Sequence, residues 1–276
     1  MDKNGSEINT APKEGVIRDL DTAFIVGTGI NENAWGPVLE AINEHDPAAG
    51  VGDDAEAANF YFARHVYALR FAARFKSDPK NGAEIAKLEA TLKDKDRQLK
   101  NCIARHLAEA TRTGNMRLRE EFIDIYNEGG WGRTLFITAN WDMLLEEYGK
   151  LSRGHVLHVH GDIESHELLY LPSEITSEPY RSEQEHEKMG RLIATTWSYI
   201  AKAPKVVIYG LSLSALDAEL GNILNIGLGE HTKDPCEVVI YNCQDQLERV
   251  ERRVRMLLAK ESRVSFKKIP LSCGKP

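Results

Sequence analysis

Short apolar runs alternate along the chain with longer segments whose apolar residues recur at helical spacing. The runs have the length of strands and are rich in β-branched and aromatic residues; they cover residues 22–26, 134–138, 155–160, 168–171, 205–209, 237–241 and 264–269. The helical segments between them cover residues 141–148, 184–203, 215–226 and 246–260. Strands that alternate with helices predict an α/β fold, with a Rossmann-like parallel sheet covered by helices on both faces.

One long segment breaks this alternation. Residues from about 54 to 128 carry a helical pattern throughout, which predicts a helical subdomain inserted between the first strand and the second. Its charged residues Lys93, Lys95, Arg97 and Lys100 are expected to form a solvated face. Residues 1–20 are polar and predict a flexible leader, so the α/β domain is expected to span residues 21–276.

The charge of the chain bears on whether it binds nucleic acid, and its cysteines bear on its cellular location. The 276 residues contain 35 Lys and Arg against 42 Asp and Glu, a net charge of −7, so no overall basic field favours direct binding to nucleic acid. The four cysteines form no C-x-x-C pair, and we expect four reduced thiols and a cytoplasmic location. The start of the chain lacks the apolar core of a signal peptide, and no run is long enough to span a membrane, so no membrane partner is expected.

The first strand ends in the turn Gly27-Thr28-Gly29-Ile30-Asn31. Glycines between a strand and a helix let backbone N–H groups approach a phosphate. The full G-x-G-x-x-G fingerprint would require glycine at position 32, where Glu32 stands, and no P-loop pattern occurs. Taken alone, the sequence of this turn is as compatible with a tight turn that binds no ligand as with a phosphate-binding loop.

Polar residues follow the next two strands. Asn140 and Asp142 come after the run 134–138; one is expected to cap the following helix, which leaves the other free at the carboxyl end of the strand, where ligands bind in open α/β sheets. His158 and His160 lie on one face of the run 155–160, and His160 is the better candidate for a ligand-facing residue because it lies at the carboxyl end of this run. A metal site formed by His158, His160 and Asp162 is an alternative, although Ile163 stands where the metallo-hydrolase pattern needs another histidine.

The later strands end in the same way. Gly210, Leu211, Ser212 and Leu213 follow one of them, and Asn242 follows another. Ser214 is expected to cap the helix after the first of these turns, with Asp217 in its first turn. Polar or glycine residues at several strand ends together predict a nucleotide-binding crevice.

As a set, these turns resemble the motifs of the sirtuin superfamily, in its bacterial sirtuin-like branch. Residues 27–31 resemble a Gly-Ala-Gly-Ile-Ser loop, and residues 138–142 resemble a Thr-x-Asn-x-Asp motif. Residues 158–161 resemble a His-Gly motif, and residues 210–213 resemble a Gly-x-Ser-Leu turn. Their order and their positions at strand ends agree with that family from residue 22 to about 245.

The resemblance implies an NAD hydrolase that cleaves the nicotinamide–ribose bond, with NAD as its substrate. It implies a cradle for the pyrophosphate made of Gly27, Thr28, Gly29, Ile30 and Asn31. Asn140 would hold water and the nicotinamide ribose, Asp142 would support that site, and His160 would act as the base. The adenosine half would be bound by Gly210, Ser212, Leu213 and Asn242.

Three departures limit the resemblance. Residues 33–37 replace the Gly-Ile-Pro-x-Phe-Arg segment of deacetylases, and the four-cysteine zinc ribbon is missing, so neither zinc nor protein deacylation is expected. In the first glycine turn, Asn31 replaces the usual serine. Members of this branch act in antiphage defence, as homo-oligomers and with a motor ATPase or a short Argonaute protein as partner. A catalytically silent sensor of NAD or ADP-ribose, and a metal-dependent hydrolase, remain the alternatives.

Overall fold

The computed structural model describes residues 20–129, 133–151, 154–231, 234–259 and 262–272. Its main sheet has six parallel strands in the order β5-β4-β1-β6-β7-β8. The strands are β1 (Thr22–Val26), β4 (Thr134–Thr138), β5 (Val156–His158), β6 (Lys205–Tyr209), β7 (Cys236–Cys243) and β8 (Val264–Leu271). The first strand, β1, lies at the centre of the sheet. The strands β4 and β5 extend the sheet on one side of β1, and β6, β7 and β8 extend it on the other, which confirms the predicted Rossmann-like fold.

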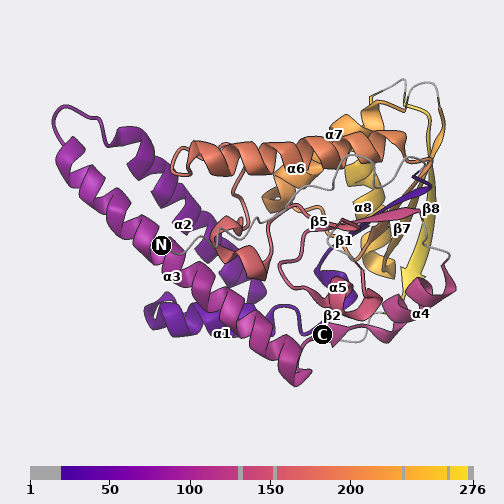
Figure 1. The fold of residues 1–276 in the computed structure, drawn as a ribbon, viewed down its shortest axis with the longest axis horizontal. Coiled ribbons are helices and arrows are strands. Elements are labelled where there is room, and N and C mark those ends of the chain that lie inside the picture. The colour runs from indigo at the N-terminus through magenta and orange to yellow at the C-terminus, as the bar shows by residue number, and fades with distance from the viewer. Residues whose placement is uncertain (1–19, 130–132, 152–153, 232–233, 260–261, 273–276) are drawn as a thin grey trace, which may run out of the picture.

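Successive residues of each strand point to opposite faces of the sheet, and both faces are covered. Phe24 lies opposite Phe136 and packs with the helices inserted after β1, whereas Ile25 lies opposite Ile208 and packs with the helices of the second half. The first layer contains α1 (Gly36–His45), α2 (Ala55–Phe75), α3 (Gly82–Thr113), α4 (Glu120–Glu128) and α5 (Leu144–Gly149). The second layer contains α6 (Glu183–Lys202), α7 (Ala218–Gly229) and α8 (Gln244–Leu257). Figure 1 shows the strands between these two groups of helices.

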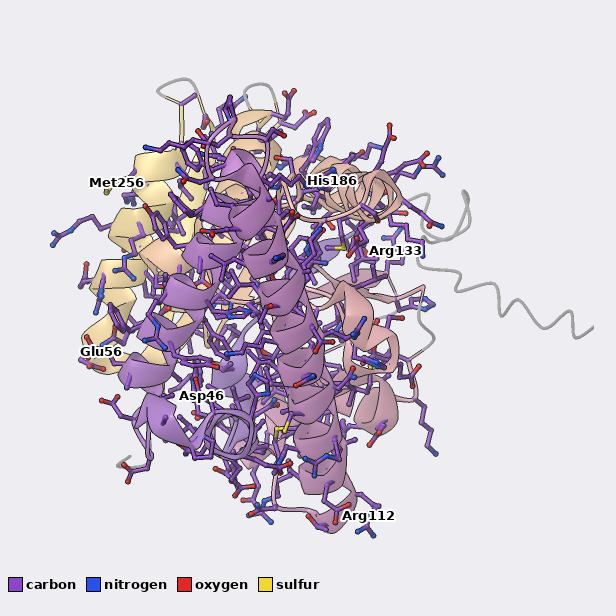
Figure 2. All side chains as sticks on the ribbon, turned by 90° about the vertical axis from the view of Figure 1, so that its left-hand side faces the viewer. Asp46, Glu56, Arg112, Arg133, His186 and Met256 are labelled. Carbon is purple, nitrogen blue, oxygen red and sulfur yellow. The ribbon has the colours of Figure 1, made fainter. Side chains whose placement is uncertain are left out.

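The helical segment predicted over residues 54–128 is present as α2, α3 and α4, with two interruptions, at residues 76–81 and 114–119. Arg117–Leu118 forms a short strand, β3, that pairs antiparallel with β2 (Asn31–Glu32) immediately after the first glycine turn. The α2–α3 hairpin extends away from the sheet in Figure 1, and Figure 2 views the molecule from the side of these helices.

The prediction of a strand over residues 168–171 is wrong. Residues Ile163–Leu168 form a 3₁₀ segment, η3, and the next three residues are buried without joining the sheet. Their backbone groups bond elsewhere: Tyr170 N donates to His160 O over 2.9 Å, and Leu171 N donates to the carboxylate of Glu174. An apolar run of four residues signals burial, and here burial comes without a neighbouring strand.

A buried ionic network attaches the α2–α3 hairpin to the rest of the fold. Lys100 of α3 lies 2.8 Å from Asp96 and 3.4 Å from Glu174, and Arg70 of α2 pairs with Glu178. Lys100 is only 3% exposed, so its predicted place on a solvated face is wrong. A lysine on an amphipathic helix is normally solvated, and here two carboxylates pair its buried charge: that of Asp96 on the same helix and that of Glu174 from a segment 74 residues later.

The described cysteines differ from one another. Cys102 and Cys236 are free thiols, as expected, whereas Cys243 is disulfide-bonded, so the expectation of a reduced thiol is wrong at this position. Cys243 lies opposite Leu271, at the paired ends of β7 and β8.

Within the described residues, no helix has both the length and the apolar character needed to cross a bilayer.

Candidate functional site

The carboxyl ends of β1 and β6 meet at the centre of the sheet, where the order of the strands reverses. Gly29 N donates to Gly210 O over 3.1 Å, and Gly27 N donates to Tyr209 O over 3.1 Å. A Cβ atom added to Gly29 would lie 2.4 Å from the Cα of Gly210, so the two backbones touch where no side chain fits. The two glycine turns that the sequence singles out therefore form one unit at the topological switch point, where ligands of this fold class bind.

The first turn uses its five residues in different ways. Thr28 is exposed and Gly29 is half-buried, whereas Ile30 is fully buried in the core. The N–H groups of Gly27, Gly29 and Ile30 already donate to backbone carbonyls. A phosphate at this turn would therefore be held mainly by Thr28 and by the close approach that the glycines permit, and Ile30 serves packing.

Asn140 joins the ends of β4 and β1. Its side chain is 5% exposed, and its Nδ2 donates to the backbone oxygen of Gly27 over 3.2 Å. Its Oδ1 is buried and has no hydrogen-bond partner among the described residues. A buried amide oxygen without a partner costs free energy, and a hydrogen bond from a ligand hydroxyl or a water would offset that cost, although this oxygen is closed to solvent in the structure.

The prediction that Asn140 or Asp142 caps the following helix is wrong, because Met143 is the N-cap of α5 and Asp142 lies one residue before it. Asp142 Oδ1 accepts from the N–H of Leu144, and its Oδ2 accepts from Asn31 Nδ2 over 2.7 Å. Burial raises the pKa of Asp142, and the two hydrogen bonds oppose that shift. The carboxylate therefore fixes Asn31 and the first glycine turn relative to the end of β4.

His160 lies beside Asn140 at the end of the neighbouring strand. Parallel pairing places Thr138 opposite His158, so Asn140 and His160 both lie two residues beyond the paired ends. His160 is half-buried, and burial lowers its pKa even though Asp217, Glu219 and the Ala139 backbone favour the charged form. A lowered pKa favours the neutral imidazole, which is the form that accepts a proton as a general base.

His158 forms a separate buried pair. Its Nε2 lies 2.8 Å from Glu146 Oε1, and its Nδ1 lies 3.0 Å from the backbone oxygen of Asn140. Burial disfavours the charged imidazole, but the hydrogen bond and charge of Glu146 outweigh it, and the pKa of His158 is raised. Glu146 was not predicted from the sequence, because only the tertiary structure brings α5 against β5.

This pair makes stability depend on pH. The raised pKa of His158 means that its charged form stabilises the fold below about pH 6.5, and this contribution is lost as pH rises through the folded pKa. Glu146→Gln is therefore expected to lower the free energy of unfolding by about 1–3 kcal/mol at pH 6 and by less at pH 9. Urea unfolding at both pH values measures this, with exposed Glu147→Gln as the matched control. An equal loss at both pH values would contradict the charged pair.

The residues predicted to hold an adenosine half lie at the ends of β6 and β7. Asn242 is buried, donates from Nδ2 to Leu211 O over 2.8 Å and accepts at Oδ1 from Cys243 N. Ser212 is exposed, whereas Leu213 is buried with a φ of 49°. Ser212 therefore presents the accessible hydroxyl of this turn. The buried side chain of Asn242 holds the turn in place through its hydrogen bond to Leu211. The predicted cap is confirmed, since Ser214 and Asp217 form a capping box.

The alternative metal site is not assembled in this arrangement. Both ring nitrogens of His158 face other partners, and Asp162 Oδ1 accepts from the N–H groups of Glu164 and Ser165. In the described part of the chain, the one group with metal-ligand spacing is Glu44, Cys102 and His106, on the surface of α1 and α3. There Glu44 already accepts from Arg105 and pairs with His106.

A cavity of about 60 Å³ lies at the β5 edge of the sheet, beside the strand-end site. Its polar lining residues are Glu146, His158, Asp162, Ser165 and Lys188, and its apolar walls include Met143, Leu168 and Met189. It holds the volume of a few water molecules. The cavity therefore adjoins the His158–Glu146 pair, and Asn140 does not line it.

Comparison with known proteins identifies no relative of this chain. No family model matches the sequence, and no curated protein and no solved structure shows significant similarity to it.

Proposed function

We propose that the chain is an NAD glycohydrolase, which converts NAD and water to nicotinamide and ADP-ribose. The observation that carries this proposal is the position of Asn140 beside His160 at the ends of adjacent strands. Asn140 offers a buried amide oxygen without a partner, and His160 offers an imidazole whose pKa is lowered by burial. Both adjoin the switch point at which a Rossmann-like sheet binds nucleotides.

The leaving group determines what the protein has to supply. The nicotinamide ring of NAD is a pyridinium, so the bond between ribose C1′ and the ring nitrogen breaks with its electron pair going to that nitrogen. Neutral nicotinamide leaves without needing a proton. The ribose acquires oxocarbenium character, as in glycoside hydrolysis, and its reaction partner is water.

The residues of the site match these requirements in separate ways. The Asn140 amide oxygen accepts a hydrogen bond from the attacking water or from a ribose hydroxyl. As the water oxygen bonds to C1′, its proton passes to neutral His160, which then releases it to solvent. Asp142 acts through Asn31, holding the first glycine turn in place, and so is a positioning residue.

The resemblance behind this proposal extends to its biological setting. It favours a role in antiphage defence, a homo-oligomeric state and a partner such as a motor ATPase or a short Argonaute protein. A silent sensor would use the same crevice to bind NAD or ADP-ribose without needing a base. The combination of His160 and Asn140 favours the enzyme.

Product analysis tests the proposal directly. Purified full-length protein incubated with NAD is expected to yield nicotinamide and ADP-ribose in equal amounts, separated by HPLC. Calorimetric titration of the same sample with NAD measures binding independently of turnover. Binding without products would indicate either the sensor alternative or an enzyme that requires its partner, and the absence of both would reject an NAD site.

A further inference from the structure

Large aromatic side chains stand exposed along the outer face of α2. Phe60 is 72% exposed, Tyr67 68%, Phe71 44% and Phe75 49%. The opposite face of this helix is already buried against the core through Ala58, Phe62, Val66 and Leu69. Monomeric proteins seldom leave several large aromatics together in water, and such patches mark interaction surfaces.

These exposed residues follow a coiled-coil spacing. Phe60, Arg64, Tyr67 and Phe71 are separated by four, three and four residues, and Arg74 and Phe75 continue the series. We refer to this set as the outer seam. A repeat that averages 3.5 residues forms a nearly straight stripe along a helix, onto which a second helix packs. The outer seam therefore fits a helical partner along the length of α2.

We propose that the outer seam is the interface of a homodimer in which α2 packs antiparallel against α2 of a second copy. The seam is complementary to itself about its middle. With the two-fold axis between positions 65 and 66, Phe60 lies opposite the partner's Phe71, and Arg64 lies opposite the partner's Tyr67. This axis crosses the middle of α2, which spans Ala55–Phe75. A two-fold interface requires this kind of self-complementarity.

The charges on α2 select the antiparallel arrangement. Glu56 lies exposed near the start of the helix and Arg74 lies exposed near its end. An antiparallel pair brings Glu56 of each copy to the partner's Arg74, whereas a parallel pair would place like charges together at both ends and at Arg64. The Arg64 guanidinium already lies 5.7 Å from the ring of Tyr61 and can stack on the partner's Tyr67 as well.

The size of the surface sets the expected strength of the dimer. The half-buried residues Ala57, Ala63 and Ala68 flank the seam and let two helix backbones approach closely. An aromatic side chain has about 150–250 Å² to bury, and these four are on average a little over half exposed, so a dimer would remove roughly 450 Å² per copy from water, or about 900 Å² in total. That area lies below the about 1,200–2,000 Å² buried in a standard interface, so we expect a weak dimer with a dissociation constant on the order of micromolar.

The oligomeric state of the full-length protein tests the proposal. Analytical ultracentrifugation across the micromolar range is expected to show a reversible monomer–dimer equilibrium for the wild type. Phe60→Glu/Phe71→Glu is expected to be monomeric at every concentration, because it buries like charges opposite each other. Met256→Glu on α8 is the matched control, since Met256 is 78% exposed, and it should dimerise like the wild type.

A charge-reversal series tests the register and does not depend on the aromatic variants. Glu56→Arg and Arg74→Glu are each expected to weaken the dimer severalfold, and the double variant should recover the wild-type equilibrium. Circular dichroism shows that each variant is folded. A monomeric wild type, including one that binds a different protein through this face, would overturn the proposal. A dimer that survives Phe60→Glu/Phe71→Glu would also overturn it, as would a double charge variant weaker than both single variants.

Discussion

Replacing His160 with alanine is expected to slow NAD cleavage by about 10²–10⁴-fold, the usual contribution of a positioned general base. The loss should appear in kcat with little change in KM, because the base acts on water during the reaction and not on bound NAD. His160 is half-buried and lies two residues beyond the end of β5, and circular dichroism of the variant checks that it is folded. HPLC of nicotinamide production measures the effect.

Two comparisons make this test specific. His166→Ala, in η3, removes a histidine six residues away and should keep the wild-type rate. Asn140→Ala should cause a loss of similar size to that of His160→Ala, because it removes the amide oxygen proposed to hold the water. A His160→Ala enzyme with wild-type turnover would remove this histidine from the mechanism.

The pH profile provides a further readout of the same residue. Burial lowers the pKa of His160 below its ordinary value of 6.5, so the neutral base persists into mildly acidic solution. The rate should therefore still exceed half of its maximum at pH 6.5 and fall further at lower pH. An acid limb centred above pH 6.5 would indicate a different titrating group.

Gly29→Ala is expected to destabilise the fold by about 1–3 kcal/mol, the usual cost of overpacking a filled space. The added Cβ would lie 2.4 Å from Gly210 Cα and 2.8 Å from Gly210 O, and backbone atoms cannot move aside as a side-chain end can. The strand ends of β1 and β6 would have to separate. The variant should therefore lose NAD binding together with stability.

Gly190→Ala supplies the matched control with the opposite sign. Gly190 lies within α6, and a Cβ there meets nothing within 4 Å. Removing a helical glycine should stabilise the protein by roughly 0.5–1 kcal/mol. Urea unfolding of both variants and the wild type measures the pair, and a neutral Gly29→Ala would show that the two turns do not pack as described.

Local pattern was sufficient for much of the fold. The runs 22–26, 134–138 and 205–209 are strands with the predicted limits, because a continuous apolar run bounded by turn residues favours a doubly covered strand. The capping box at Ser214 was also predictable, since its hydrogen bonds join residues three apart. The run 168–171 shows the limit of this information, because burial alone does not specify a neighbouring strand.

The sequence by itself determined the parallel α/β class, the helical insertion and the polar strand ends, since each depends on residues close together in the chain. Only the tertiary structure decided how those ends are used: Asn31 holds Asp142 across 111 positions, and Glu146 meets His158 through the packing of α5 on β5. The tertiary structure also buries Lys100 and leaves the side chains of Phe60 and Tyr67 exposed to solvent. These outcomes depend on contacts between distant segments, for which neither hydrophobic periodicity nor spacing along the chain carries a signal.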